Sequence, residues 1–150
     1  MDVLSKEYVL EQGIDFDEEL WFTSYSDEVL DNPEDEDGKP FTGLAYELYE
    51  NGNLAYYCYY KNGFKEGNYV KFHHNGKLKS IDYIIKGQTR GIRKIWYESE
   101  ELKYEGTFKF GVCLKYTEWD KQGNIIRQKV APTKEELGLI NRLSDCDDNE

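Results

Sequence analysis

The chain has 150 residues, of which 33% are charged and 39% are apolar. This length accommodates one globular domain or one repeat array and excludes two enzyme-sized domains. Thirteen tyrosines against one methionine and three prolines favour strands over helices. No stretch approaches the roughly 18 apolar residues that span a bilayer, and residues 1–10 lack the basic start of a signal peptide. We therefore expect a cytoplasmic protein.

The three cysteines agree with a reducing compartment. Cys58, Cys113 and Cys146 are odd in number and far apart in the sequence, which argues against a disulfide framework and against a zinc site. We interpret Cys58 and Cys113 as small core residues.

Charge is distributed unevenly along the chain. Residues 1–40 carry a net charge of −12, residues 41–130 a net charge of +5, and residues 131–150 a net charge of −4. Such an acidic arm would repel nucleic acid, so we expect no nucleic-acid partner. Membrane binding is disfavoured for the same reason.

The densest acidic run, residues 31–38, leaves three interpretations open. The run is a solvated mobile loop, it forms a surface that meets a basic partner, or the arm lies on its own array with its carboxylates near lysines. The second interpretation makes five acids candidates for partner binding: Asp31, Glu34, Asp35, Glu36 and Asp37.

Two short segments of the arm have strand character. Residues 14–16 and 20–25 are rich in apolar and aromatic residues, and one or both could pair with the exposed edge of the first repeat. We therefore expect residues 1–40 to form an acidic arm that caps the array.

A repeat of 24 residues organises the middle of the chain. Residues 43–66, 67–90 and 91–114 align without gaps, and a shortened fourth copy follows to residue 131. Each copy has an apolar residue at its sixth place, before a turn, and another at its twelfth place, after the turn. These residues are Leu48, Phe72, Trp96 and Trp119, and then Leu54, Leu78, Leu102 and Ile125.

The turns give the repeat its topology. Glycine supplies the positive φ of a tight hairpin at Gly52, Gly76 and Gly123, whereas the third copy has Ser99-Glu100. A second turn leads from each copy to the next, at Asn62-Gly63, Lys86-Gly87 and Phe110-Gly111. The pattern therefore predicts a mainly β fold, an elongated antiparallel meander over residues 41–131.

Alternation along the strands assigns the two faces. Leu44, Tyr46 and Leu48 share one face, which we expect to carry the core. Glu47, Lys71 and Arg93 point to the other face. Residues 56–60 (YYCYY) place large side chains on both faces at once, so another segment must cover the second face there.

A short helix is expected after the array. Thr133 and Glu136 form a capping box, and Leu137, Ile140 and Leu143 follow on one helical stripe. The helix should span residues 132–144 and cap the end of the array, and the acidic tail at 145–150 should be disordered.

The repeat resembles a known family. Gly, a Tyr-rich strand, Asn-Gly-Lys-Leu, a second strand and Lys-Asn-Gly are similar to the MORN-variant repeats of bacterial antitoxin and immunity proteins. The lead-in Gly38-Lys-Pro-Phe-Thr-Gly43 is also similar, and the likeness covers residues 38–130. It implies a hairpin array that binds other molecules, in many members as the antidote to a toxin.

No pattern of catalytic or metal-binding residues is present. His73 and His74 are the only histidines, and as neighbours on a strand they face opposite sides and cannot chelate one metal. There is no nucleophile elbow, no phosphate-binding glycine loop and no glycosidase-like carboxylate pair. The acidic run also fails as a calcium loop, because Pro33 occupies the first ligand position. We expect no enzyme, no metal and no cofactor.

Binding through the surface therefore remains. Tyrosines are enriched at interface hot spots because their rings are rigid, although they also stabilise thin sheets through cross-strand pairs. The aromatic candidates for partner binding are Tyr56, Tyr57, Tyr59, Tyr60, Tyr83 and Tyr97.

The leading hypothesis is an immunity protein that binds and neutralises a cognate toxin. The acidic arm would speed the encounter with a basic toxin of the nuclease or deaminase type. The alternative is a scaffold or a MORN module that binds anionic lipid through the net charge of +5 on residues 41–130.

Overall fold

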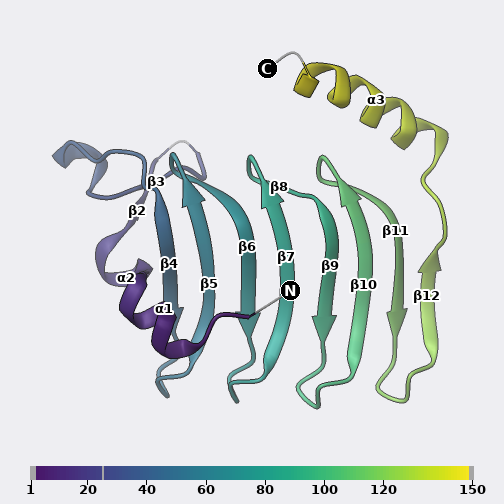
Figure 1. The fold of residues 1–150 in the computed structure, drawn as a ribbon, viewed down its shortest axis with the longest axis horizontal. Helices are drawn as coiled ribbons and strands as arrows, with labels where there is room; N and C mark the ends of the chain where they lie inside the picture. The colour runs from purple at the N-terminus through teal and green to yellow at the C-terminus, as the bar shows by residue number, and fades with distance from the viewer. Residues whose placement is uncertain (1–2, 25, 149–150) are drawn as a thin grey trace.

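The computed structural model describes residues 3–24 and 26–148, apart from the side chains of residues 145–148. One long, curved sheet dominates it (Figure 1). Its strands follow the order β1-β4-β5-β6-β7-β9-β10-β11-β12, with β8 paired to β7. The strands of the array are β4 (Gly43–Leu48), β5 (Leu54–Lys61), β6 (Phe64–Phe72), β7 (Leu78–Ile85), β8 (Gln88–Thr89), β9 (Gly91–Trp96), β10 (Leu102–Lys109), β11 (Val112–Trp119) and β12 (Ile125–Lys129).

The segment before the array contains short elements. They are α1 (Lys6–Gln12), β1 (Ile14–Asp15), α2 (Phe16–Glu19), β2 (Trp21–Phe22), β3 (Val29–Leu30) and the 3₁₀ helix η1 (Glu34–Glu36). A single helix, α3 (Lys134–Asp148), follows the array.

The predicted antiparallel meander is confirmed. Neighbouring strands from β4 to β12 pair antiparallel along the chain, and each hairpin turn lies where the glycine spacing placed it. The connecting turns have positive φ at both central residues, for example 50° at Asn62 and 88° at Gly63. This is the type I′ geometry whose twist matches that of a hairpin.

The third copy adopts the same turn without glycine. Glu100 has φ = 78°, whereas Gly52, Gly76 and Gly123 stand at the equivalent place in the other copies with φ of 87–88°. An L-residue is strained in this region because its Cβ crowds the backbone. The third turn therefore stores local strain that the other three do not.

Replacing Glu100 with glycine should relieve this strain. Because Glu100 also forms an ion pair with Lys77 at 3.3 Å, Glu100→Ala is the matched control that loses the pair and keeps the strain. We expect the free energy of unfolding of E100G to be about 0.5–1 kcal/mol higher than that of E100A. This difference already includes the stabilising effect that the greater entropy of glycine has on the unfolded chain. Urea unfolding of both variants measures the difference, and equal stabilities would contradict it.

A side-chain hydrogen bond joins each repeat to the next. The Tyr49 hydroxyl donates to the Phe72 carbonyl at 2.7 Å, and the Tyr97 hydroxyl donates to the Trp119 carbonyl at 2.8 Å. Between them, His73 Nε2 donates to the Trp96 carbonyl at 2.9 Å. The three donors share the seventh place of the repeat, so the half-buried His73 serves as an inter-repeat link.

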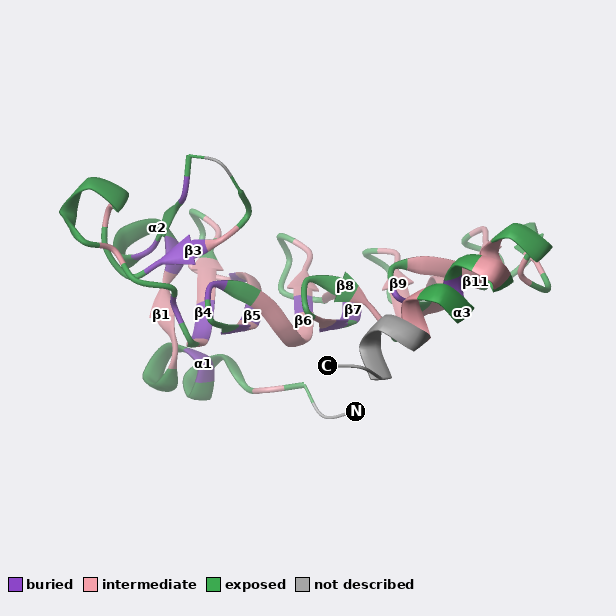
Figure 2. Cartoon of the chain, turned by 90° about the horizontal axis from the view of Figure 1, so that it is seen from above, coloured by how far each residue is buried: buried purple, intermediate pink, exposed green. Residues whose placement is uncertain are grey.

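The core lies on both faces of the sheet at its N-terminal end, which corrects the expectation of a single core face. One face, called face 1, carries Leu44, Leu54, Tyr57 and Val70, which α1 and Leu4 cover. The opposite face, called face 2, carries Ala45, Cys58 and Tyr60, which Phe16, Leu20, Val29 and Phe41 cover. Figure 2 shows α1 on one side of the sheet and α2 and β3 on the other. The predicted cover over residues 56–60 is thus confirmed.

The arm pairs with the array as expected in one of its two strands. β1 pairs parallel with β4, placing Ile14 opposite Ala45. The predicted pairing of the second segment, residues 20–25, with the array is wrong. Trp21–Phe22 pairs instead with Val29–Leu30 and forms a separate hairpin. Phe16 begins α2, since Asp15 caps that helix through the Asp17 amide at 3.1 Å. Tyr25 lies outside the described residues.

The capping box before α3 is confirmed. The Thr133 amide donates to Glu136 Oε1 at 2.8 Å, and the Glu136 amide donates to Thr133 Oγ1 at 3.1 Å. Lys129 Nζ also donates to Glu136 and to the Cys113 carbonyl at 2.8 Å, which ties the helix to β11. Ile140 is buried, whereas Leu137 is exposed. The helix continues to Asp148, four residues past the predicted end, because neither glycine nor proline interrupts it after Gly138; residues 149–150 lie outside the described residues.

Candidate partner-binding surface

Among the side chains that the structure describes, a dense group of exposed acids lies at the N-terminal end of the molecule. The acids of α2 and η1 point outward while the apolar residues of the same segment pack inward, since Phe16, Leu20 and Val29 belong to the core of face 2. We call this outer surface the acidic end surface. Its residues are Asp17, Glu18, Glu19, Trp21, Phe22, Asp31, Glu34, Asp35, Glu36 and Asp37, all of them exposed.

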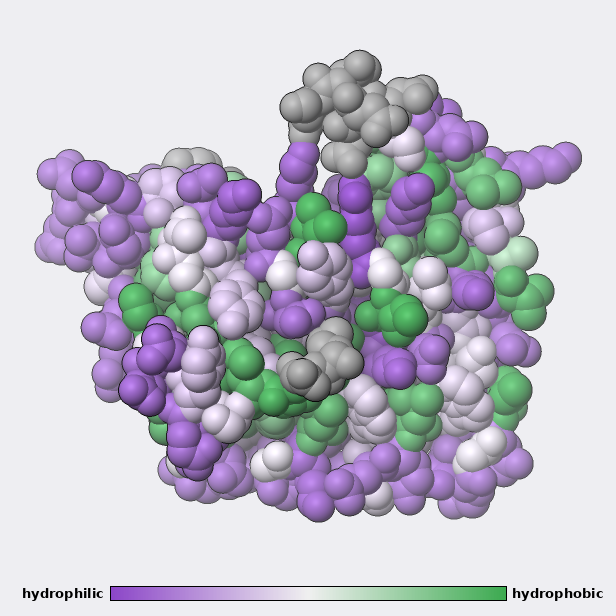
Figure 3. Space-filling model, viewed as in Figure 1, coloured by the Kyte–Doolittle hydropathy of each residue, from purple (hydrophilic) through white to green (hydrophobic). Residues whose placement is uncertain are grey.

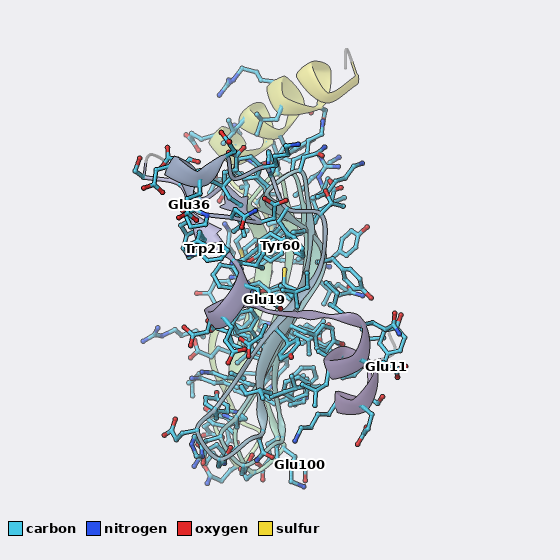
Figure 4. All side chains as sticks on the ribbon, turned by 90° about the vertical axis from the view of Figure 1, so that its left-hand side faces the viewer. Glu11, Glu19, Trp21, Glu36, Tyr60 and Glu100 are labelled. Carbon is cyan, nitrogen blue, oxygen red and sulfur yellow. The ribbon has the colours of Figure 1, made fainter. Side chains whose placement is uncertain are left out.

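Two aromatic rings stand among these acids. Trp21 lies between Glu19 and Glu36 along the same side of the molecule (Figure 4). Phe22 is 58% exposed, and its ring packs at 5.2 Å from the buried ring of Phe16. Exposed aromatic rings that are held rigidly from below are typical of interface hot spots. The acidic end surface therefore combines long-range attraction for cations with apolar contact area.

The backbone holds the acidic run in a defined shape. Asp31 Oδ1 accepts the Lys39 amide at 2.9 Å, and Glu34 Oε2 accepts the Ser24 amide at 3.1 Å. Asp37 closes η1 in the left-handed region with φ = 61°. The Glu36 amide donates to the Pro33 carbonyl at 2.9 Å within this run. The five acids predicted from the sequence thus lie in one segment and are all exposed.

The arm docks through apolar contacts and hydrogen bonds, among them that of the Val29 amide with the Gly63 carbonyl at 2.7 Å. Ion pairs of the array join Lys61 to Glu66 at 3.7 Å, Lys77 to Glu100 at 3.3 Å, and Arg127 to Glu118 at 4.0 Å, all within the array itself. The buried contacts of the arm are those of Val9 on face 1 and of Phe16 and Val29 on face 2. The carboxylates of the acidic end surface are exposed to solvent.

A hollow of about 640 Å³ separates the acidic end surface from the turns of the array. Phe22 and Asp27 line it from the arm, and Phe64, Lys65 and Lys86 line it from the array. Phe64 is also exposed. The exposed aromatic area of the arm therefore continues onto the array across this hollow.

The tyrosines predicted to contact a partner divide into two groups. Tyr57 and Tyr60 are buried, 1% and 5% exposed, which does not fit with a partner contact. Tyr56 and Tyr59 are half-buried, and Tyr56 packs edge-on against Tyr69 at 5.6 Å. Tyr97 is half-buried and forms the inter-repeat link, so Tyr83, 42% exposed, is the most accessible of the six.

Burial changes the acidity of the groups under the arm. Desolvation raises the pKa of the Cys58 thiol to about 12, against 9.0 for an ordinary thiol. Desolvation likewise raises the pKa of Tyr69 to about 12, against 10.0, with the nearby Cys58 adding to the shift. The pKa of Tyr56 is raised by burial and by the neighbouring Glu47 carboxylate. These groups are therefore neutral at physiological pH, and Cys58 is not a reactive thiolate.

The raised pKa values predict a loss of stability in alkali. Because the folded-state pKa of Cys58 and Tyr69 lies above the unfolded value, their stabilisation is complete below about pH 9 and is lost as the pH rises toward 12. Urea unfolding between pH 8 and 11.5 in reductant should show a constant free energy up to about pH 9 and then a decline. Cys58→Ala should make the decline shallower, whereas Tyr83→Phe, at an exposed ring, should not. An unchanged slope in C58A would contradict the assignment.

Both histidines of the chain have structural partners. His74 lies beside the Tyr49 ring at 4.8 Å and the Asn51 amide at 3.1 Å, and His73 is engaged in its inter-repeat link. Among the side chains that the structure describes, those of residues 3–24 and 26–144, no three of His, Cys, Asp or Glu are grouped so that they could hold a metal ion. None of the helices described is both long and apolar enough to span a membrane.

Comparisons with known proteins agree with this architecture. The sequence profile of the family described as MORN repeat variant matches residues 41–62, 65–84 and 90–110, which correspond to the three full copies. Immunity protein YwqK of Bacillus subtilis (strain 168) is 47% identical over 120 residues, covering 80% of this chain and 77% of that protein. No solved structure matches the chain. The chain therefore belongs to the family of MORN-variant repeat proteins that includes this immunity protein.

Proposed function

We propose that the chain is an immunity protein that binds a cognate protein toxin in the cytoplasm and neutralises it stoichiometrically. The observation that carries the proposal is the 47% identity to an immunity protein over 80% of the chain. Family membership and the name of this relative both point to a non-catalytic protein. The mode of action would then be occlusion of the toxin by a rigid surface.

The acidic end surface is our candidate for the contact with the toxin. Its carboxylates, exposed along α2 and η1, would attract a basic toxin such as a nuclease or deaminase and raise the association rate. The rings of Trp21 and Phe22 would then supply the short-range contact. Charge complementarity of this kind mainly sets the rate of encounter, while the buried aromatic contacts set the lifetime of the complex.

Co-expression tests the proposal. The protein encoded next to this chain is expressed in a host whose growth it arrests, with and without this chain. We expect growth to be restored and the two proteins to co-purify. Growth that stays arrested, although the chain accumulates in folded form, would refute the assignment.

A matched variant tests the surface separately. Trp21 and Phe22 are replaced together by serine, and the control replaces the exposed Ile125 and Ile126 of β12, at the opposite end of the sheet, by serine. We expect the first variant to lose rescue and the second to keep it, with both remaining folded. If only the control variant lost rescue, the contact with the toxin would lie at the β12 end of the sheet, and the acidic end surface would be excluded.

A further inference from the structure

Face 1 continues past α1 as a partly exposed apolar surface, on which Ile92 is exposed, Leu78 and Trp96 are half-buried and Ile81 is buried. A hollow of about 400 Å³ lies there, lined by Val3, Leu78, Ile81, Ile92, Lys94 and Trp96. Figure 3 looks onto this face and shows several apolar residues, in green, beyond the helix, with hydrophilic residues between them. Ile92 is 49% exposed at the rim. The hollow is continuous with the core, because Leu78, Ile81 and Trp96 belong to the same cluster as Val9.

The hollow repeats a site that the chain already fills with a helix. One copy earlier, Val9 of α1 and Leu4 cover Leu54, Tyr57 and Val70, and Val9 is completely buried. Adding the repeat length of 24 residues to Leu54, Tyr57, Val70 and Phe72 gives Leu78, Ile81, Lys94 and Trp96. The walls of the hollow are therefore the repeat equivalents of the walls of the α1 site.

One substitution distinguishes the two sites. Lys94 stands where the first site has the buried Val70, and its cross-strand neighbour is Glu105. A lysine can lay its methylene groups along an apolar surface while its ammonium group reaches the water. The hollow thus keeps an apolar floor from Leu78 and Ile81 and gains a charged rim, which suits a surface that is exposed before binding and covered afterwards.

The helices of this chain are already seated elsewhere. α1 covers its own site on β4 and β5, and α3 lies beyond the strand ends near β11, with Ile140 buried (Figure 1). We infer that the hollow accepts an amphipathic helix of the toxin, which lays its apolar stripe over Leu78, Ile81 and Ile92 as α1 does one copy earlier. This inference rests on the proposed function and adds a second contact to the acidic end surface.

Two exposed isoleucines give a matched test. Ile92 at the rim is 49% exposed, and Ile126 on β12, away from the hollow, is 52% exposed, so an aspartate at either place should be tolerated by the fold. Binding of the full-length protein to the protein encoded next to it is measured by calorimetry. We expect Ile92→Asp to weaken the affinity about tenfold or more and Ile126→Asp to change it less than about twofold.

The outcomes separate this inference from the proposed function. If the wild type binds and restores growth but I92D binds equally well, the hollow is not a contact and the inference is overturned, while the proposed function stands. If the wild type does not bind at all, both fail.

Photo-crosslinking identifies the occupant. With p-benzoylphenylalanine in place of Ile92, we expect cross-links to a toxin segment whose apolar residues recur at three- and four-residue intervals. Cross-links to a second copy of this chain, or to an extended toxin segment, would overturn the inference.

Discussion

Replacing Tyr57 with alanine is expected to lower the free energy of unfolding by about 3–5 kcal/mol, the usual cost of removing a buried aromatic ring. The ring is 1% exposed and packs at 6.1 Å from that of Phe72, within the cluster that α1 and Leu4 cover. Its hydroxyl also accepts the Leu4 amide at 2.9 Å. The substitution therefore removes both the floor of face 1 and the tether of the arm.

Tyr57→Phe is the matched control for this prediction. It keeps the ring and removes only the acceptor for the Leu4 amide, at an expected cost of about 1 kcal/mol. Urea unfolding of the two variants separates packing from tethering. If Y57A cost no more than Y57F, the arm would not be part of the folded core, and the acidic end surface would lose its rigid support.

Neutralising the last two acids of η1 and the following Asp37 should slow the association with the toxin about tenfold at low ionic strength. The variant combines Asp35→Asn, Glu36→Gln and Asp37→Asn. Asparagine tolerates the left-handed conformation that Asp37 adopts, so the turn should be preserved. The dissociation rate should change little, because exposed rim charges act mainly on encounter.

The control removes the same charge elsewhere. Three exposed acids of the array and of α3 are replaced by glutamine: Glu50, Glu98 and Glu135. Stopped-flow association is measured at several salt concentrations. The η1 variant alone should be slow, and its difference from the wild type should vanish at high salt, where the screening length is short. Equal slowing by the control would show that net charge acts and the position of the acids does not.

The array could be predicted from the sequence because its information is local and repeated. Gly52, Gly76 and Gly123 mark turns that have the expected positive φ, and alternation places Leu44 and Glu47 on opposite faces. The capping box at Thr133 and Glu136 was equally visible. In each case a residue type reports directly on the backbone conformation that it favours.

The arm could be predicted only in part, because its structure depends on contacts distant in sequence. α1 is seven residues long and buries a single side chain, Val9, so its sequence shows too little periodicity to indicate a helix. The sequence predicted pairing of Trp21 and Phe22 with the array, whereas tertiary packing pairs them with Val29–Leu30.

The binding candidates show the same division. The acids at 31–37 are exposed as charged residues usually are, whereas Tyr57 and Tyr60 are buried by a segment whose position the sequence did not reveal. The inter-repeat link at Tyr49, His73 and Tyr97 did have a signal in the sequence. Each full copy has, at its seventh place, an aromatic ring that carries a hydrogen-bond donor.

Titration of the toxin with this chain tests stoichiometric neutralisation most directly. The activity of a fixed amount of the proposed cognate toxin is measured against increasing amounts of the chain. Neutralisation by binding predicts a linear fall that ends at about one equivalent and does not progress with time. Complete loss of toxin activity at a small fraction of an equivalent, growing with incubation, would reveal catalysis and contradict the proposed function.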